Sequence, residues 1–194
     1  MEQPIQARQV ANNNRALESQ IRENFGRVVY SHKVHEKCAD EYTTKLKRIK
    51  LAQIILSAIT TGSLLTAILG SNSASAIVAT IFSTILLVLN AYTKDYGLGE
   101  LAQKHVDTAT RLWAIREAYL SLLTDSSEGL ISSDQVRQKR DELNDSLAAI
   151  YQNAPRTTAK AYAQAQKALK INEELTFSDE EIDKFVPAPL RRAK

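Results

Sequence analysis

Residues 51–93 read LAQIILSAITTGSLLTAILGSNSASAIVATIFSTILLVLNAYT and contain no Asp, Glu, Lys, Arg or His. A small polar run at residues 70–75 divides this stretch into two apolar segments, 51–69 and 76–93. At 1.5 Å per residue each segment would form a helix of about 27–28 Å, close to the roughly 30 Å hydrocarbon thickness of a bilayer. Helices of soluble proteins normally keep a charged outer face, and neither segment has one. The stretch therefore favours a transmembrane hairpin over two buried core helices.

Basic residues flank the hairpin on both sides, whereas the turn at residues 70–75 is uncharged. By the positive-inside rule, we expect both termini in the cytoplasm and the turn on the outer side. The polar segment 1–16 has no apolar run behind its charges, so we expect no cleavable signal peptide, and the hairpin itself would direct insertion. The basic residues on the two flanks include Arg27, Lys33, Lys37, Lys45, Lys47, Arg48, Lys50, Lys94 and Lys104.

Apolar and small residues recur at alternating spacings of four and three on both sides of the hairpin, which predicts two helices that pair as a coiled stalk. The first covers about 17–50, interrupted at most near Gly26, and runs into the first span. The second covers about 94–123 and starts at DYGLGE, whose glycines permit a change of direction. The first seam comprises Ile21, Phe25, Val28, His32, His35, Ala39, Tyr42, Leu46 and Ile49. The second comprises Leu98, Ala102, His105, Ala109, Leu112, Tyr119 and Leu123.

Two capping-box patterns mark later helices. The pattern at 132–135 predicts a helix over about 132–152, and the one at 178–181 predicts a short helix within the C-terminal segment 176–194. Pro155 suits the first turn of a helix over about 155–172 that would lie against its predecessor. The seam between those two helices would comprise Val136, Leu143, Leu147, Ile150, Tyr162 and Leu169.

These elements predict an all-α membrane protein in which a two-helix transmembrane hairpin is extended by a cytoplasmic helical stalk. One membrane domain would cover residues 17–175, between the polar segment 1–16 and the segment 176–194. The composition argues against nucleic acid as a partner, because the net charge is only +3 and no basic tract is interleaved with aromatic residues. The chain has one cysteine, Cys38, so an intrachain disulfide is excluded, and inert packing is its expected role.

Catalysis has no support in the sequence. We find no Ser or Cys with a plausible base and orienting acid, no paired carboxylates in an apolar setting and no ligand cluster of metal-binding spacing. We therefore expect no enzyme activity, no catalytic residue, no cofactor and no metal. The acidic run from Glu173 to Asp183 is interpreted as a solvated helix N-terminus rather than a cation site.

Three histidines fall in the stalk seams: His32, His35 and His105. Antiparallel pairing of the two stalk helices would bring His35 and His105 to similar depths, within about 6 Å by helical rise. Such a group can hold a metal or act as a proton switch, since imidazole titrates near neutral pH. No carboxylate or cysteine stands at ligand spacing, so we favour seam histidines satisfied by their neighbours.

Polar residues within the spans form two short stripes. A ring of hairpins would turn such stripes toward a water-filled pore, and that arrangement requires a homo-oligomer. The alternative is close helix packing through small and hydroxyl side chains, and the sequence leaves both interpretations open. The first stripe consists of Gln53, Ser57 and Thr60, and the second of Thr80, Ser83 and Asn90.

The order of these features resembles a known family. His35-x-x-x-Ala39-x-x-Tyr42 leads into a span containing SAITTG at residues 57–62. After a polar turn and a second span, a long helix carries His105, Ala109, Leu112 and Trp113. Over roughly residues 17–170 this layout is similar to the SLATT domain, the two-transmembrane effector found with nucleotide-signal synthases (SMODS) and nucleotide-sensing SLOG domains in bacterial conflict systems.

The resemblance implies a pore-forming or membrane-disrupting effector of antiviral defence, located in the bacterial inner membrane. Members often carry a sensor in the same chain, and no such segment is evident here. The trigger would then come from a separately encoded nucleotide-signal synthase or sensor. A non-conducting membrane scaffold whose stalk recruits a partner protein is the main alternative, and a soluble four-helix module is the third.

Overall fold

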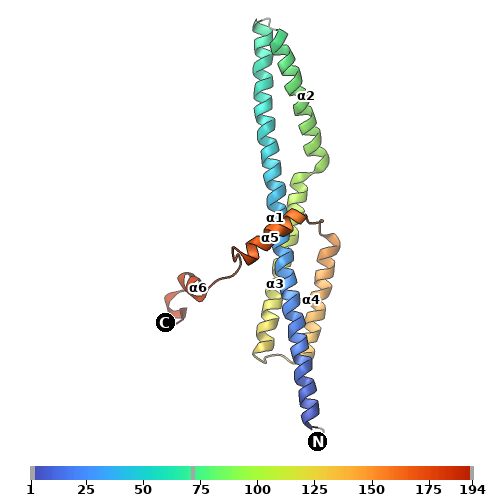
Figure 1. Ribbon diagram of the computed structural model, residues 1–194, viewed down its shortest axis with the longest axis vertical. Coiled ribbons are helices and arrows are strands. Elements are labelled where there is room, and N and C mark those ends of the chain that lie inside the picture. The colour runs from blue at the N-terminus through green and yellow to red at the C-terminus, as the bar shows by residue number, and fades with distance from the viewer. Residues whose placement is uncertain (1–2, 71–72, 193–194) are drawn as a thin grey trace.

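The computed structural model describes residues 3–70 and 73–192, and it describes side chains from Arg15 onward. Figure 1 shows an elongated molecule in which every described element is helical. This architecture confirms the expected all-α fold. The elements are α1 (Gln3–Gly70), α2 (Ser73–Tyr96), α3 (Leu98–Ser127), α4 (Ser133–Asn153), α5 (Ala159–Lys170), α6 (Asp179–Phe185) and the short 3₁₀ helix η1 (Ala188–Leu190).

Helix α1 is continuous over 68 residues and forms both the first stalk helix and the first span. Its length is about 100 Å at 1.5 Å per residue. It passes Gly26 without the interruption that we considered there, and it begins at Gln3, so it includes most of the segment expected to precede it. Because no proline follows Pro4 within α1, nothing in its interior removes a backbone donor.

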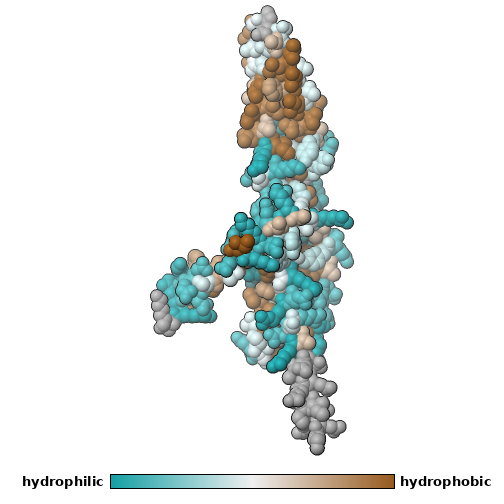
Figure 2. Space-filling model, viewed as in Figure 1, coloured by the Kyte–Doolittle hydropathy of each residue, from teal (hydrophilic) through white to brown (hydrophobic). Residues whose placement is uncertain are grey.

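The hairpin pairs the C-terminal part of α1 with α2, and it leaves its large apolar side chains uncovered. Ile54, Leu69 and Leu87 are 67%, 84% and 68% exposed. Figure 2 shows a hydrophobic band over the hairpin, whereas most of the stalk surface is hydrophilic. Both helices are long and apolar enough to cross a membrane. The interpretation as a soluble four-helix module is therefore wrong, because its core would have to bury these side chains. The tip of the turn, residues 71–72, lies outside the described residues.

One glycine makes the junction between α2 and α3. Gly97 has φ +51° and separates the two helices by a single residue, while its carbonyl oxygen accepts a hydrogen bond from the Leu101 N–H at 2.9 Å. The next glycine, Gly99, lies against α1, since a Cβ there would meet Leu46 Cδ2 at 3.4 Å. The change of direction expected from DYGLGE is thus made by one left-handed residue.

We expect Gly97→Ala to destabilise the protein by about 1–2 kcal/mol, because an L side chain is disfavoured in the left-handed region. Gly26→Ala is the matched control, because Gly26 lies inside α1 with no atom within 4 Å of an added Cβ. This second change should stabilise the helix by roughly 0.5–1 kcal/mol. Chemical denaturation in mild detergent measures both. Equal effects of the two substitutions would contradict the special role of Gly97.

The stalk core lies between α1, α3 and α4. The two predicted seams meet as expected: Ile21 and Val28 of α1 pack in one cluster with Leu112 and Tyr119 of α3. Helix α4 completes this cluster, and its predicted capping box is present, with the Ser132 hydroxyl accepting from the Gln135 N–H at 3.3 Å. The buried members of the cluster are Leu17, Ile21, Val28, Leu112, Tyr119, Leu122, Val136 and Ile150.

Helix α5 differs from its prediction in both start and placement. It begins at Ala159 rather than Pro155, because the Thr158 side chain caps it by accepting from the Ala161 N–H at 3.0 Å. It packs across α1 instead of lying along α4. Its buried face consists of Ala161, Ala165 and Ala168, whereas Tyr162 is 53% exposed. Small side chains at spacings of four and three let two helices approach closely. The close contact of these alanines with α1 therefore decides the placement of α5, and the larger side chain of Tyr162 stays exposed.

The C-terminal segment leaves the stalk after α5. The second predicted capping box is present at the start of α6, where the Ser178 hydroxyl accepts from the Glu181 N–H at 3.3 Å. Figure 1 shows α6 set apart from the stalk at the end of an extended connection. An ion pair between Arg192 and Asp179 closes this small unit on itself.

Candidate functional site

The polar residues of the spans meet across the hairpin. Gln53 of α1 donates from Nε2 to Oδ1 of Asn90 on α2 at 2.8 Å, and to Thr93 Oγ1 at 3.4 Å. At 100° per residue, Ser57 and Thr60 lie within about 40° of Gln53 around α1. Around α2, Ser83 and Thr80 lie about 20° and 80° from Asn90, so the two polar stripes follow the same side of the hairpin, with Thr80 at its margin. We call the six predicted residues together the polar edge: Gln53, Ser57, Thr60, Thr80, Ser83 and Asn90.

Pairing of the two helices covers only part of the polar edge. Gln53 and Thr60 are half-buried, whereas the other four side chains remain exposed. The hydroxyls of Thr60, Thr80 and Ser83 donate to carbonyls of their own helices, at 2.8, 2.9 and 2.9 Å. Such internal bonds make a hydroxyl tolerable in hydrocarbon. The exposed amide of Asn90 is more costly to place against lipid tails, so this edge favours contact with water or with another polar surface.

Two buried histidines join the stalk helices. His35 of α1 and His105 of α3 are 3% and 0% exposed, and their Nδ1 atoms are 2.9 Å apart. One ring must donate its proton and the other accept it, so the contact needs at least one neutral imidazole. Tyr42 stacks on His105 with ring centroids 5.6 Å apart. The structure thus confirms that His35 and His105 reach the same depth.

Burial determines the protonation of this pair. It lowers the pKa of His35 to about 4, and repulsion by His105 and His32 acts in the same direction. Burial also lowers the pKa of His105, whose Nε2 has no hydrogen-bond partner among the described residues. Both rings are therefore neutral at pH 7. Protonating either one would place a charge in the stalk core.

His32 does not join the pair. Its Nδ1 lies 3.0 Å from the Ala109 carbonyl oxygen of α3, its Nε2 lies 3.5 Å from Glu36, and its ring packs near Trp113 with centroids 5.4 Å apart. Among the residues that the structure describes, no three His, Cys, Asp or Glu side chains gather as a metal site. Cys38 is buried, and burial raises the pKa of its thiol, so it is a poor nucleophile.

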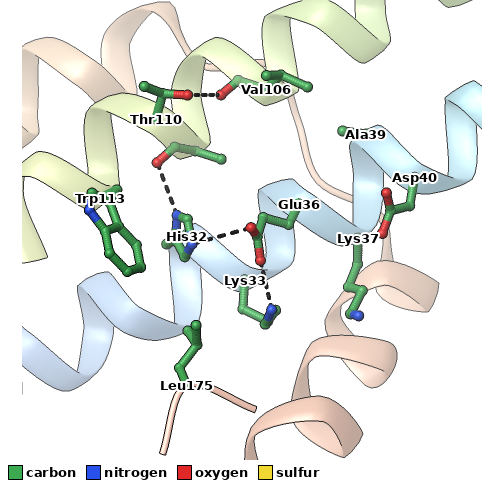
Figure 3. Close-up of a pocket in the computed structure, with 11 residues that line it drawn as sticks. His32, Lys33, Glu36, Lys37, Ala39, Asp40, Val106, Thr110, Trp113 and Leu175 are labelled. Atoms are coloured by element: carbon green, nitrogen blue, oxygen red, sulfur yellow. Dashed lines mark hydrogen bonds and ion pairs between the residues drawn. The ribbon is translucent and has the colours of Figure 1, made fainter. Parts of the chain in front are cut away.

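An open pocket of about 560 Å³ lies beside His32, between α1, α3 and the segment that follows α5. Figure 3 shows its charged side chains on α1, with Trp113 of α3 on one side and Leu175 on the other. Lys33 is only 7% exposed, and its Nζ lies 2.7 Å from Glu36 and 2.9 Å from Glu174. Burial alone would lower the pKa of Lys33, but these two carboxylates raise it, so the lysine stays charged.

Glu174, which precedes the pocket residue Leu175, is the residue that sequence reasoning misplaced. We grouped it with a solvated helix N-terminus, which describes Asp179–Glu181 in the first turn of α6 but not Glu174. It lies between Glu173 and Leu175, which both have positive φ values, +53° and +72°. This backbone turns its carboxylate back onto α1, where it also reaches Lys37 at 3.5 Å. No spacing rule connects positions 33 and 174, so the sequence carried no signal for the pair.

We expect Glu174→Gln to destabilise the attachment of residues 171–176 to α1 by about 1 kcal/mol, since Lys33 keeps only Glu36 as a partner and Glu174 is partly exposed. Hydrogen exchange of the amides of residues 171–176 measures this, and exchange should accelerate about fivefold. Glu173→Gln is the matched control, with the same charge change on a neighbouring exposed residue. Equal acceleration in both variants would contradict a specific role for the ion pair.

These features define a helical membrane protein with two spans and a long stalk outside the bilayer. Over residues 17–181 the sequence matches the family described as SMODS and SLOG-associating 2TM effector domain family 4. The chain belongs to this family, which confirms the resemblance seen in the sequence. No curated protein and no solved structure matches the chain.

Proposed function

We propose that this protein is an antiviral effector of the bacterial inner membrane that assembles into a homo-oligomer and permeabilises the membrane when a separate signal triggers it. The observation that carries the proposal is the exposed part of the polar edge. After α1 and α2 pair, Ser57, Thr80, Ser83 and Asn90 remain uncovered within the apolar band. Two spans cannot enclose a pore, so several copies must turn this edge toward one another or toward water.

The proposed action is assembly rather than catalysis. The buried titratable groups have structural partners: His35 and His105 bond each other, and Lys33 bonds two carboxylates. The family description links the domain to SMODS and SLOG, and this supports a separately encoded nucleotide-signal synthase or sensor as the source of the trigger. Membrane-potential measurements in cells that express the protein beside its native trigger test the proposal. Unchanged potential would favour a scaffold.

We place both termini in the cytoplasm. Lys45, Arg48 and Lys50 lie within two turns of the first span, and Lys94 lies in the last turn of α2, so the basic residues gather on the stalk side. We expect a reporter that is active only outside the inner membrane to stay inactive when fused to either terminus. A reporter inserted at residue 72 should be active. Activity of either terminal fusion would overturn this topology.

The scaffold alternative has one observation in its favour. The C-terminal segment carries large apolar side chains that the stalk does not cover: Phe177, Phe185 and Leu190 are 63%, 81% and 73% exposed. Such residues suit the capture of a partner protein. Deleting residues 176–194 separates the two functions. Loss of partner binding with intact permeabilisation would assign recruitment to this segment and conduction to the hairpin.

A further inference from the structure

A second groove lies between α1 and α5, directly beneath the membrane end of the stalk. It has a volume of about 470 Å³, and the residues that matter here are Asp40, Glu41, Lys45, Arg48, Ile49 and Lys160. The first span begins at Leu51. By helical rise, the α1 part of the groove therefore extends from the edge of the apolar segment to about 16 Å from it.

The chemistry of the groove changes in a fixed order along α1. Ile49 stands next to the span. Arg48 and Lys45 follow within the next turn and a half, and Glu41 and Asp40 come one turn further from the membrane. Along α1 the groove therefore passes from apolar to cationic to anionic in the direction that leaves the bilayer, and Lys160 of α5 lies against Glu41 at the anionic end.

A phospholipid beside the protein presents its own groups in the same direction: glycerol and acyl chains, then phosphate, then the terminal group of the headgroup. Lys and Arg are the side chains that bind phosphate best, and carboxylates accept hydrogen bonds from an ammonium. We propose that this groove binds the phosphoethanolamine headgroup of a membrane phospholipid. Lys45 and Arg48 hold the phosphate, and the ammonium donates to Asp40 and Glu41.

The contacts within the groove prepare it for this ligand. Lys45 Nζ donates to Tyr92 Oη of α2 at 2.6 Å, which directs the ammonium of Lys45 toward the membrane end of the stalk. Lys160 of α5 lies 3.0 Å from Glu41 and neutralises part of its charge. Among the described residues, neither Arg48 nor Asp40 forms a side-chain hydrogen bond or ion pair, so both are available to a ligand.

The carboxylates decide which headgroup fits. A site made of cations alone would prefer any lipid with net negative charge. Beyond Lys45 and Arg48 stand two carboxylates and one further cation, Lys160, which is paired with Glu41. This end of the groove keeps a net negative charge, so it favours an ammonium, which gains charge-assisted hydrogen bonds, over an anionic terminal group. A phosphocholine headgroup has the same net charge but no N–H to donate. The inference rests on membrane placement of the hairpin and is independent of whether the protein conducts.

Native mass spectrometry of the protein in mild detergent tests the site, with short-chain phosphatidylethanolamine, phosphatidylcholine and phosphatidylglycerol as probes. We expect phosphatidylethanolamine to bind about tenfold more tightly than phosphatidylcholine, the effect of losing a hydrogen bond between charged groups. Phosphatidylglycerol should bind more weakly than phosphatidylethanolamine. Equal binding of the first two, or tighter binding of phosphatidylglycerol, would overturn the proposal. If soluble phosphoethanolamine at equal concentration displaced the lipid, the groove would bind the free headgroup compound, and the proposal of a lipid ligand would be overturned.

Two variants locate the ligand in the groove. Arg48→Gln should weaken binding of phosphatidylethanolamine and phosphatidylcholine alike, about tenfold, since it removes a phosphate contact. Lys47→Gln is the matched control: it has the same charge change on the adjacent exposed residue, which does not line the groove. Asp40→Asn should reduce the preference for phosphatidylethanolamine and leave phosphatidylcholine binding unchanged. Equal losses for Arg48→Gln and Lys47→Gln would show general attraction to the basic surface and would contradict the site.

Discussion

Cells that express the Gln53→Leu/Asn90→Leu variant are expected to keep their membrane potential and exclude dye, whereas the unaltered protein depolarises them once it is triggered. The two amides are the most polar groups of the polar edge, and they bond each other at 2.8 Å across the hairpin. Replacing both with Leu removes the pair together, so neither amide is left in the apolar band without its partner and the hairpin stays inserted. The edge then presents hydrocarbon where a conducting assembly needs hydration.

A control variant separates this effect from general disturbance of the spans. Thr66→Leu changes an exposed hydroxyl residue of α1, and by helical rotation it lies about 120–180° from Gln53, Ser57 and Thr60. This variant should still depolarise the cells. Crosslinking in membranes should give the same discrete ladder of oligomers for all three proteins. If the Gln53→Leu/Asn90→Leu variant is still toxic and depolarises the cells, the polar edge packs helices and does not line a conducting path. A strictly monomeric protein would contradict the proposed homo-oligomer.

Acid is expected to destabilise the stalk by roughly 3 kcal/mol between pH 6.5 and pH 4, the value of a pKa difference of about 2.5. The pKa of His35 is near 6.5 in the unfolded chain and about 4 in the folded protein. Between these values the unfolded chain binds more protons, so stability increases with pH. The contribution of neutral His35 is complete above pH 6.5, is lost as the pH falls toward 4, and changes no further below that.

The matched variant is His35→Gln, which keeps a polar side chain in contact with His105 but does not titrate. Its free energy of unfolding, measured by denaturant titration in mild detergent at each pH, should depend less on pH between 6.5 and 4 than that of the unaltered protein. His105 contributes in the same direction, because burial lowers its pKa as well, so a smaller dependence remains. Identical pH profiles for the two proteins would contradict a neutral, buried His35.

Sequence patterns within single helices were sufficient to predict much of the architecture. Hydrophobicity without charge over 51–93 indicated the hairpin, because a span needs only length and apolar side chains. The four-three spacing indicated which faces of α1 and α3 meet, because helical periodicity assigns residues to a face without knowledge of the partner. The capping boxes of α4 and α6 were evident because their bonds join residues three apart. The depth of His35 and His105 followed from counting residues on both sides of the span.

Only the tertiary structure decided how distant segments meet. That α5 lies across α1 through three alanines, and not along α4, depends on the path of the link at residues 154–158. The pair of Lys33 with Glu174 depends on positive φ values at Glu173 and Leu175, which no side-chain pattern indicates. The groove beneath the membrane exists only because α5 brings Lys160 to Glu41. In each case the energy comes from contacts between residues more than a hundred positions apart, whereas sequence patterns report only interactions within a few turns of one helix.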